Sequence, residues 1–239
     1  MDLIILCGGI GSRIQSVAKG RQKCILPVND IPFLKLVAQK YISSGHVSRV
    51  FLAAGFQGSQ ISCDIVSSIA DIDVIISTEE RRLGTGGAIK KILLEHEVSK
   101  SLMIVNGDSL CGIGSANFLN DIDLANNPGI IIGVVKMEDT SRYGRLTIND
   151  DMIVEKFSEK ESTIQAPGYI NCGLYFANSE SLIKVVTTKC SDVFSIEHDV
   201  VPDFVSNSCA RAITIPGAFI DIGIPSDYYT AFKLLSGFV

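Results

Sequence analysis

Two early cations and two distant acids are the residues best suited to chemistry. Arg13 follows a run of glycines, and Lys23 lies ten positions further on. An arginine binds a phosphate group through two parallel N–H donors. Asp108 follows an apolar stretch, and Asp221 stands between two isoleucines, where a carboxylate is costly unless it has partners. These residue types indicate chemistry on phosphate groups.

The glycine run Gly8-Gly9-Ile10-Gly11-Ser12 comes directly after an apolar strand pattern. Glycines let backbone N–H groups approach a phosphate closely. The run is not a Walker loop, because no Gly-Lys-Ser/Thr closes it. It is not a dinucleotide fingerprint either, because Ile14 stands where that pattern needs glycine. A tight strand-to-helix turn explains the glycines equally well, so only Arg13 and Lys23 favour phosphate binding.

Composition excludes several classes of protein. The net charge is −5, which argues against a nucleic-acid or anionic-membrane partner. No apolar run approaches the roughly 20 residues that cross a bilayer, and the N-terminus does not resemble a signal peptide. The seven cysteines form no C-x-x-C pair, so we expect reduced thiols and a cytoplasmic location. No spacing suggests a Ser/His/Asp or Cys/His nucleophile.

Apolar runs alternate with helical patterns over the first 110 residues. Strands are expected at 3–7, 49–54, 72–77 and 102–105, with helices at 32–45, 57–69 and 86–97. This alternation predicts an α/β fold with a Rossmann-like, mainly parallel sheet flanked by helices. Ligands then bind at the carboxyl ends of the strands. Asp108 directly follows the fourth strand and is expected at that edge.

The second half, 111–239, is expected to be richer in β-structure. Strands are predicted at 129–136, 145–148, 152–157, 169–177 and 211–215, with a hairpin turn at Asn149-Asp150-Asp151. Helical patterns cover 179–187, 196–206 and 226–235. No repeat or linker divides the chain. We therefore predict one domain over 1–239, with a nucleotide-binding half (1–110) and a closing half that holds the second substrate (111–239).

Several motifs together resemble those of the sugar-1-phosphate nucleotidylyltransferases. They are Gly-Gly-x-Gly-Ser-Arg followed by Lys-x-x-x-Pro-Val, then 83–88, 106–108, 143–146, 157–160, 169–175 and 221–228. The match runs in order along nearly the whole chain, which makes it specific. The short length and the stretch 219–229 most resemble the D-glycero-D-manno-heptose 1-phosphate guanylyltransferases. The resemblance implies a GT-A-like nucleotidyltransferase fold.

The resemblance also implies a reaction and its residues. A sugar 1-phosphate attacks the α-phosphorus of a nucleoside triphosphate, and pyrophosphate leaves. Arg13 would bind the leaving phosphates and Lys23 the α-phosphate or the sugar phosphate. Asp108 and Asp221 would bind Mg²⁺ together with phosphate oxygens. This expectation requires the two carboxylates to face one another at the same edge of the sheet.

The binding residues implied by the resemblance fall into two sets. The nucleotide would contact Leu6, Cys7, Gly8, Gly9, Gly11, Ser12, Arg13, Glu79, Gly84, Thr85 and Gly107. The sugar phosphate would contact Gly86, Gly87, Gly144, Glu159, Lys160, Asn171 and Gly173. Glu79 or Glu80 could accept hydrogen bonds from guanine, but also from thymine or uracil. GTP is favoured, and a homodimer is possible.

The chain also departs from the family pattern. Gln22 replaces the usual proline before Lys23, so a more mobile loop is expected, and Arg81-Arg82 replaces a Glu-Pro pair. Synthesis of GDP-mannose, dTDP-glucose or UDP-glucose remains an alternative, as does a catalytically silent regulatory subunit that binds nucleotide sugars. A glycosyltransferase is less favoured, because Asn106-Gly107-Asp108 lacks the Asp-x-Asp of that class.

Overall fold

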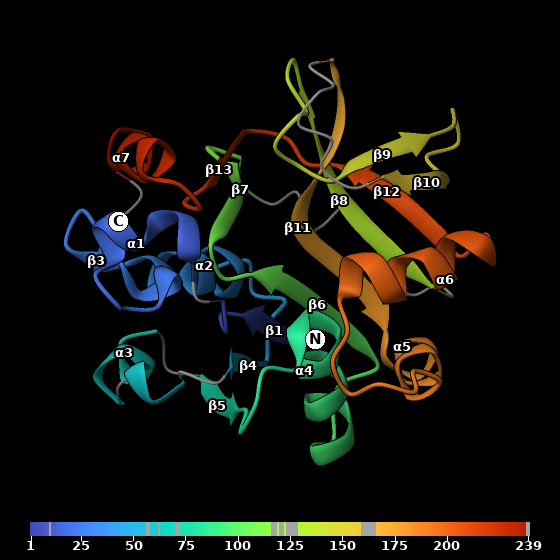
Figure 1. Cartoon of the computed structure of the whole chain (residues 1–239), viewed down its shortest axis with the longest axis horizontal. Helices are drawn as coiled ribbons and strands as arrows, with labels where there is room; N and C mark the ends of the chain where they lie inside the picture. Colours follow the sequence, from blue (N-terminus) through green and yellow to red (C-terminus); the bar gives the residue numbers. More distant parts are fainter. Residues whose placement is uncertain are drawn as a thin grey trace.

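The computed structural model describes most of the chain. The described residues are 1–9, 11–55, 58–61, 63–69, 72–115, 119, 122, 129–158 and 166–237, with the backbone alone at 63 and 64. Figure 1 shows a central twisted sheet with helices on both sides. Among the described residues, strands from both halves of the sequence form a nine-stranded sheet.

The first half of the chain contributes four parallel strands. They are β1 (Asp2–Leu6), β4 (Arg49–Gly55), β5 (Asp73–Thr78) and β6 (Ser101–Asn106), in the order β5-β4-β1-β6. The predicted parallel arrangement is therefore confirmed. Strand β1 consists almost entirely of buried residues, which is typical of a parallel strand covered on both faces.

The second half extends the sheet in mixed orientation. Strand β11 (Gly168–Asn178) lies antiparallel to β6, and β8 (Ile130–Met137) pairs with β11 and with β12 (Ala210–Thr214). The hairpin β9 (Arg145–Ile148) and β10 (Val154–Ser158) continues beyond β11. The turn predicted at 149–151 is confirmed, because Asn149 Oδ1 accepts bonds from the backbone N–H groups of Asp151 and Ile153.

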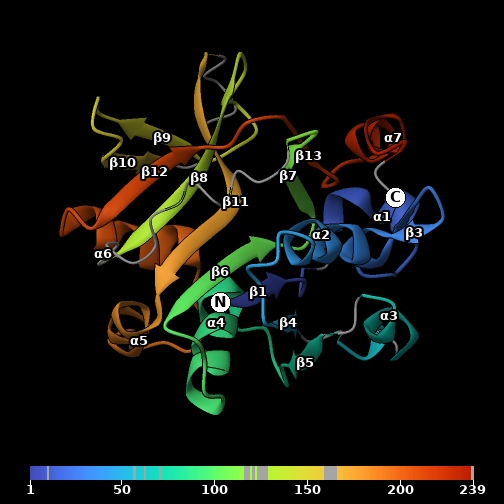
Figure 2. The same ribbon diagram turned by 180° about the vertical axis from the view of Figure 1, so that it is seen from behind.

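Helices cover both faces because the strands alternate between two apolar cores. Leu3 and Ile5 of β1 pack into one core and Ile4 into the other. Figure 2 shows α2 (Phe33–Ile42) and α7 (Pro225–Leu234) on one side and α5 (Ser179–Thr187) and α6 (Val201–Ser206) on the other. Helix α4 (Gly84–Glu95) packs beside α5 on the second core.

Several short elements surround the carboxyl ends of the parallel strands. They are η1 (Ser12–Ile14), α1 (Gln15–Ala18), η2 (Lys23–Ile25), β2 (Pro27–Val28), β3 (Ile31–Pro32), η3 (Gly58–Gln60), α3 (Cys63–Ser67), β7 (Ser109–Ile113) and β13 (Ala218–Asp221). The helix expected at 196–206 divides into η5 (Ile196–Val200), with π-type hydrogen bonding, and α6. The sequence prediction did not include the β7–β13 ladder.

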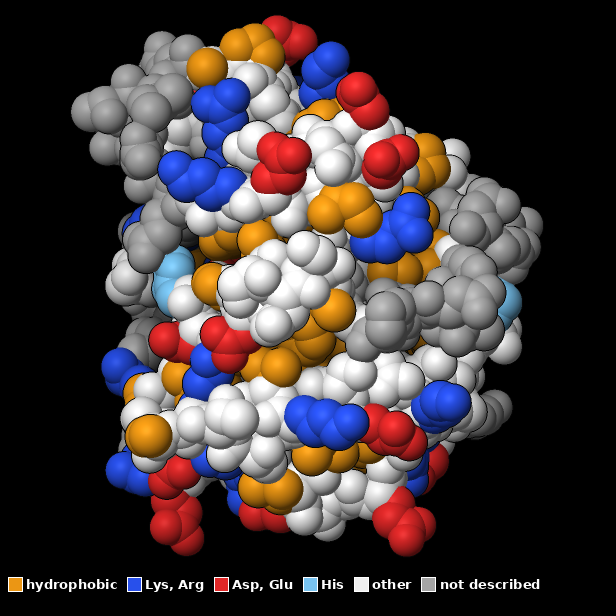
Figure 3. All heavy atoms as spheres, turned by 90° about the vertical axis from the view of Figure 1, so that its right-hand side faces the viewer, with side chains coloured by type: hydrophobic (Ala, Val, Ile, Leu, Met, Phe, Trp, Pro, Cys, Tyr) orange, Lys and Arg blue, Asp and Glu red, His pale blue; other side chains and the backbone are white. Residues whose placement is uncertain are grey.

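The surface over α4, α5 and α6 carries charges of both signs. Figure 3 shows basic and acidic side chains interspersed there, with apolar side chains between them. Within the described part of the chain, no helix combines the length and the apolar character that a bilayer span requires.

Candidate active site

The β7–β13 ladder brings the two predicted acids together. In its antiparallel register Asp221 lies opposite Ser109, the residue after Asp108. The backbone N–H of Ile222 donates to the carbonyl oxygen of Asp108 at 2.9 Å. Residues 113 positions apart in the chain thus lie side by side at the carboxyl end of β6. The prediction that these acids share one edge of the sheet agrees with this geometry.

Both predicted cations lie beside this acidic pair. The ammonium group of Lys23 forms an ion pair with Asp108, and the residue is 9% exposed. Arg13 is exposed on η1, and its guanidinium lies 3.3 Å from where a Cβ atom of Gly223 would be. Gly223 in turn donates its N–H to Asp221 Oδ1 at 2.5 Å. The arrangement places two positive charges next to two negative ones.

Electrostatics at Asp221 reflect this arrangement. Burial raises the pKa of the Asp221 carboxyl above its ordinary value, and the charge of Asp108 raises it further. Lys23, the N–H of Gly223 and Arg13 oppose this increase in pKa. Two carboxylates held this close repel each other, so a cation between them is favoured.

Gln22 fixes the segment that carries Lys23. Its backbone N–H donates to Gln60 Oε1 at 2.7 Å, and its Nε2 donates to the carbonyl oxygen of Ala54 at 2.8 Å. Gln22 is fully buried, so its bond to Ala54 forms away from water, while its bond to Gln60 is partly buried. They restrain the loop where the family pattern has proline, and this argues against the greater mobility expected from the sequence.

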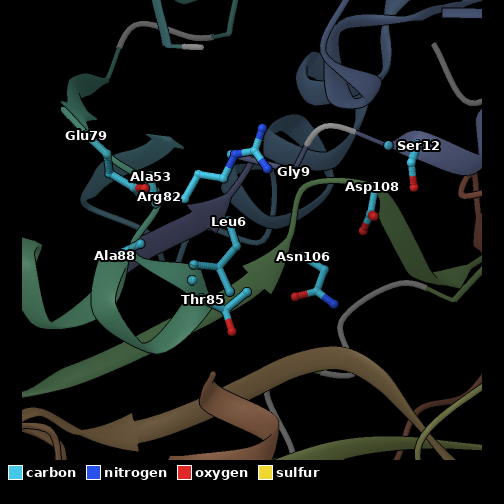
Figure 4. A pocket seen from close by; sticks show the side chains of 13 residues that line it. Leu6, Gly9, Ser12, Ala53, Glu79, Arg82, Thr85, Ala88, Asn106 and Asp108 are labelled. Atoms are coloured by element: carbon cyan, nitrogen blue, oxygen red, sulfur yellow. The ribbon is translucent and has the colours of Figure 1, made fainter. Parts of the chain in front are cut away.

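A pocket of about 580 Å³ opens beside the acidic pair. Figure 4 shows it between the glycine loop, the start of α4 and the carboxyl ends of β1 and β6. Its lining consists of Leu6, Gly8, Gly9, Gly11, Ser12, Ala53, Glu79, Arg82, Gly84, Thr85, Ala88, Asn106 and Asp108. The volume lies within the range typical of small-molecule sites.

Most of the predicted nucleotide-binding residues line this pocket, but three do not. The Cys7 thiol points into the core, and its backbone N–H bonds to Ala53. Gly107 donates its N–H to Leu6, and Arg13 lies beside Gly223. These three residues stay predictions as nucleotide contacts.

The glycine loop depends on a close backbone contact. A Cβ atom at Gly8 would lie 2.8 Å from the Cα atom of Gly55 at the end of β4. No real side chain tolerates that distance, so glycine is required for the two chain segments to lie this close. Beyond this contact, Gly9 and Gly11 line the pocket wall.

The sequence analysis did not assign Ala53, Arg82, Ala88 or Asn106 as site residues. Asn106 stands in the motif Asn106-Gly107-Asp108, so its position after β6 was an available signal. Its Oδ1 atom is buried and has no hydrogen-bond partner among the described residues. In Figure 4 the Arg82 side chain extends from the rim toward the glycine loop. The two alanines carry no sequence signal of this kind.

The segment before α4 is held by Glu79. Its Oε2 atom accepts a bond from the backbone N–H of Leu83 at 2.9 Å, and burial raises the pKa of its carboxyl. Gly86 and Gly87 both donate their N–H groups to the carbonyl oxygen of Phe194. Those donors are therefore occupied, and the packing does not support the predicted sugar-phosphate role of these two glycines.

Three of the other predicted sugar-side residues, Gly144, Asn171 and Gly173, meet at the bulge in β11. The backbone N–H of Asn171 donates to Gly144 at 2.9 Å, and Gly173 donates to Asn171 Oδ1 at 3.0 Å. Gly173 has φ +74°, and a Cβ atom there would lie 2.6 Å from Asn106 Nδ2. Glycine thus lets β11 approach the pocket wall at Asn106. Glu159 and Lys160 lie outside the described residues.

The donor set of the acidic pair fits a hard divalent cation. Asp108 and Asp221 offer carboxylate oxygens, which Mg²⁺ prefers, and their mutual repulsion favours a shared cation. Among the described residues, no cluster of three or more His, Cys, Asp or Glu could hold a metal. Further ligands for such an ion would therefore be substrate oxygens or water.

Residues 3–236 match the Nucleotidyl transferase family, and the chain belongs to that family. Solved structures and curated proteins resemble the chain over nearly its whole length. The mixed sheet flanked by helices is the fold of these nucleotidyltransferases, so the predicted fold class is confirmed.

Three of these proteins show how similar the chain is to named relatives. The chain is 32% identical to the D-glycero-alpha-D-manno-heptose 1-phosphate guanylyltransferase of Campylobacter jejuni, covering 96% of this chain and 97% of the relative. It is 30% identical to the protein of the same name from Aneurinibacillus thermoaerophilus, over the full length of both. HddC from Yersinia pseudotuberculosis superposes with a TM-score of 0.82 at 31% identity, covering 97% and 98% of the two chains. A second structure of HddC contains GMP-PN (TM-score 0.81).

Proposed function

We propose that this protein transfers GMP from GTP to D-glycero-α-D-manno-heptose 1-phosphate, which gives a GDP-heptose and pyrophosphate for surface-glycan synthesis. The observation that carries the proposal is the pairing of β7 with β13, which joins Asp108, Asp221, Lys23 and Arg13 beside a pocket lined by the glycine loop. The names of the two curated relatives and the GMP-PN complex of HddC support the choice of substrates.

The reaction joins two polyanions, so its barrier is mainly electrostatic and positional. An oxygen of the sugar phosphate attacks the α-phosphorus, a new P–O bond forms, and the bond to pyrophosphate breaks. Lys23 would neutralise the phosphate oxygens at the reacting centre, because its ammonium is buried beside Asp108. Arg13, exposed at the edge of the site, would bind the departing pyrophosphate.

The pocket residues would orient the two substrates. Backbone groups of Gly9 and Gly11 would bind phosphate, since both line the pocket. Asn106 Oδ1 is buried without a described partner, and a hydroxyl group of a substrate would satisfy it. Asn171 would bind hydroxyls of the sugar from the bulge in β11. Glu159 and Lys160, predicted from the motif, would add contacts to the sugar and its phosphate.

Asp108 and Asp221 are the residues proposed to hold Mg²⁺. When bound, this ion neutralises phosphate charge and fixes the geometry of the triphosphate. We also place the reaction in the cytoplasm. GTP is available there, and the six cysteines whose side chains are described are free thiols.

The test is release of pyrophosphate from a matrix of substrates. GTP, ATP, CTP, UTP and dTTP are each combined with heptose 1-phosphate, mannose 1-phosphate and glucose 1-phosphate. We expect the highest kcat/KM for GTP with the heptose phosphate. Asp221→Asn serves as the inactive control, because it removes one carboxylate and keeps the side-chain volume.

Two other outcomes would change the assignment. A higher kcat/KM with mannose or glucose 1-phosphate, or with dTTP or UTP, would replace the substrate and keep the reaction class. Binding of a nucleotide sugar without turnover for any pair would favour the silent regulatory subunit and overturn the proposed enzyme.

A further inference from the structure

A partly buried carboxylate outside the set described above joins Thr85 of the pocket lining to the buried Tyr175 of β11. Glu197 lies in η5, the π-type turn before α6. Its Oε2 atom accepts hydrogen bonds from Ser195 Oγ at 2.8 Å and from Thr85 Oγ1 at 3.3 Å. Its Oε1 atom accepts a hydrogen bond from the Tyr175 hydroxyl at 3.3 Å. Three hydroxyl groups from different segments therefore converge on one side chain.

The Oε2 atom anchors the carboxylate to the start of α4. Thr85 lines the pocket, and its hydroxyl also accepts a bond from the backbone N–H of Ile196 at 2.9 Å. Ser195 Oγ accepts from the backbone N–H of Glu197 at 3.1 Å while it donates to Oε2. Each hydroxyl has a single hydrogen, and both hydrogens are donated to Glu197. The carboxylate thus has little freedom to rotate.

The Oε1 atom determines the direction of the next hydrogen bond. Tyr175 is fully buried, and burial, with the charge of Glu197, raises the pKa of its hydroxyl well above the ordinary value. The hydroxyl therefore keeps its only hydrogen, which it donates to Glu197. Toward Asn171 it can only accept, and it accepts from Asn171 Nδ2 at 2.5 Å.

This sequence of bonds fixes the amide of Asn171. Its Nδ2 atom faces Tyr175, and its Oδ1 atom accepts from the backbone N–H of Gly173. The amide of Asn171 then has one N–H hydrogen and one oxygen lone pair left for a ligand, both in a defined orientation. A sugar hydroxyl that donates and accepts can use both groups.

We propose that Glu197 is a positioning residue for the sugar: through Tyr175 it orients the amide of Asn171, while Thr85 anchors it to the nucleotide side of the pocket. The proposal rests on the proposed function, because sugar binding at Asn171 is part of it. An ionised carboxylate fits this role because it only accepts hydrogen bonds. Glutamine would present an NH₂ donor at one oxygen position, and one of the three hydroxyls would then have to reverse or lose its bond.

The kinetic test compares Glu197→Gln and Tyr175→Phe with the wild type. We expect each variant to raise KM for the sugar 1-phosphate about tenfold, which corresponds to the loss of one well-oriented hydrogen bond. KM for GTP should stay within about twofold of the wild-type value. The double variant should raise that KM no further than either single change, because both act through Asn171. Glu180→Gln is the matched control, since Glu180 is exposed on α5.

A second readout does not depend on turnover. In protein labelled with ¹⁵N-asparagine, the side-chain amide signals of Asn171, assigned by their loss in Asn171→Asp, should move in Glu197→Gln and in Tyr175→Phe. They should stay unchanged in Glu180→Gln. Tyr175→Phe tests the same connection without a new buried donor, so it keeps the test valid should Glu197→Gln fail to fold.

The outcomes separate the inference from the proposed function. Unchanged Asn171 signals in both variants overturn the positioning role, whether or not the enzyme turns over. Wild-type KM values for the sugar in both variants overturn it as well, while the proposed function stands. An inactive wild type whose Asn171 signals respond as expected overturns the proposed function and leaves the hydrogen-bonded connection supported.

Discussion

Lys23 is held by an ion pair and packs closely against the glycine loop. Its ammonium pairs with Asp108, and a Cβ atom at Gly11 would lie only 3.1 Å from the Lys23 Cβ atom. A buried lysine is costly to desolvate, and the carboxylate of Asp108 offsets that cost. This position suits a lysine whose charge must meet phosphate oxygens at one point. It does not suit a solvated surface lysine.

Replacing this lysine should abolish most of the activity. We expect Lys23→Met to lower kcat/KM by about 10²- to 10³-fold, the usual cost of removing a charged group that stabilises a phosphoryl transition state. Pyrophosphate release measures the loss, and circular dichroism checks the fold. Lys189→Met is the matched control, because it removes a lysine paired with Asp203 at 2.7 Å, away from the pocket. Activity of Lys23→Met within threefold of the control would contradict the assigned role.

The loop that carries Lys23 depends on one buried glutamine. Gln22 has φ −61°, which proline also adopts, so the backbone would accept the proline of the family pattern. The proline, however, would remove the N–H that bonds to Gln60 and the amide that bonds to Ala54. The two sequences therefore stabilise the same loop by different means.

Gln22→Pro should destabilise this protein. We expect the free energy of unfolding to fall by about 1–3 kcal/mol, because the buried acceptor at Ala54 and the partly buried acceptor at Gln60 lose their donors. Urea unfolding measures the change. Gln39→Ala, a substitution in the helix α2, is the comparison, and it should cost less than about 1 kcal/mol. A midpoint equal to or above that of the wild type would show that the proline compensates for both bonds.

The N-terminal ends of two central strands are joined by an ion pair. Asp2 is 1% exposed and accepts hydrogen bonds from Arg49 Nη2 at 2.6 Å and from the backbone N–H of Ser99 at 2.8 Å. Burial by itself would raise the pKa of Asp2, but these hydrogen bonds outweigh it and lower the pKa below the ordinary 3.8. The ionised form therefore stabilises the folded state.

This pair should give a pH-dependent contribution to stability. Above the ordinary pKa near 3.8 the contribution is fully present, and it is lost as the pH falls through the lower folded-state value. We expect Asp2→Asn to cost about 1–3 kcal/mol at pH 7 and clearly less at pH 3. Urea unfolding at both pH values measures the difference. An effect of equal size at both would contradict the ionic contribution of Asp2.

Across the whole molecule, the extent to which the sequence predicts the structure depends on the length of each pattern. The four parallel strands follow continuous apolar runs such as Leu3 to Ile5, so their order of appearance and type were predictable. Strand β13 has only four residues, and nothing local indicates that it pairs with β7. The meeting of Asp108 and Asp221 could therefore be expected from the motifs, whereas the ladder that produces it could not.

Contacts between distant segments explain what the sequence analysis missed in the site. Glu197 stands in a helix-like pattern, where a glutamate is normally solvated, and the packing of η5 against β11 and α4 gives it two distant partners, Tyr175 and Thr85, besides the local Ser195. The same applies to Gly86 and Gly87, whose donors are occupied by Phe194. Their motif indicated ligand binding, but the neighbouring segment lies more than one hundred residues away.

The acidic pair joins β7, which continues from the nucleotide-binding half, to β13, which lies near the C-terminal helix. Binding at this pair should therefore stabilise the whole fold. We expect GTP with Mg²⁺ at about one hundred times its Kd to raise the free energy of unfolding by about 2.7 kcal/mol, with a clear increase in Tm. GTP with EDTA should give a much smaller increase, since Asp108 and Asp221 would then face the phosphates without a cation between them. In Asp108→Asn/Asp221→Asn the difference between Mg²⁺ and EDTA should vanish, while Lys189→Met should keep it. Equal Tm values for the wild type with Mg²⁺ and with EDTA would exclude this pair as the metal site, because a cation that binds only to the folded site must stabilise it.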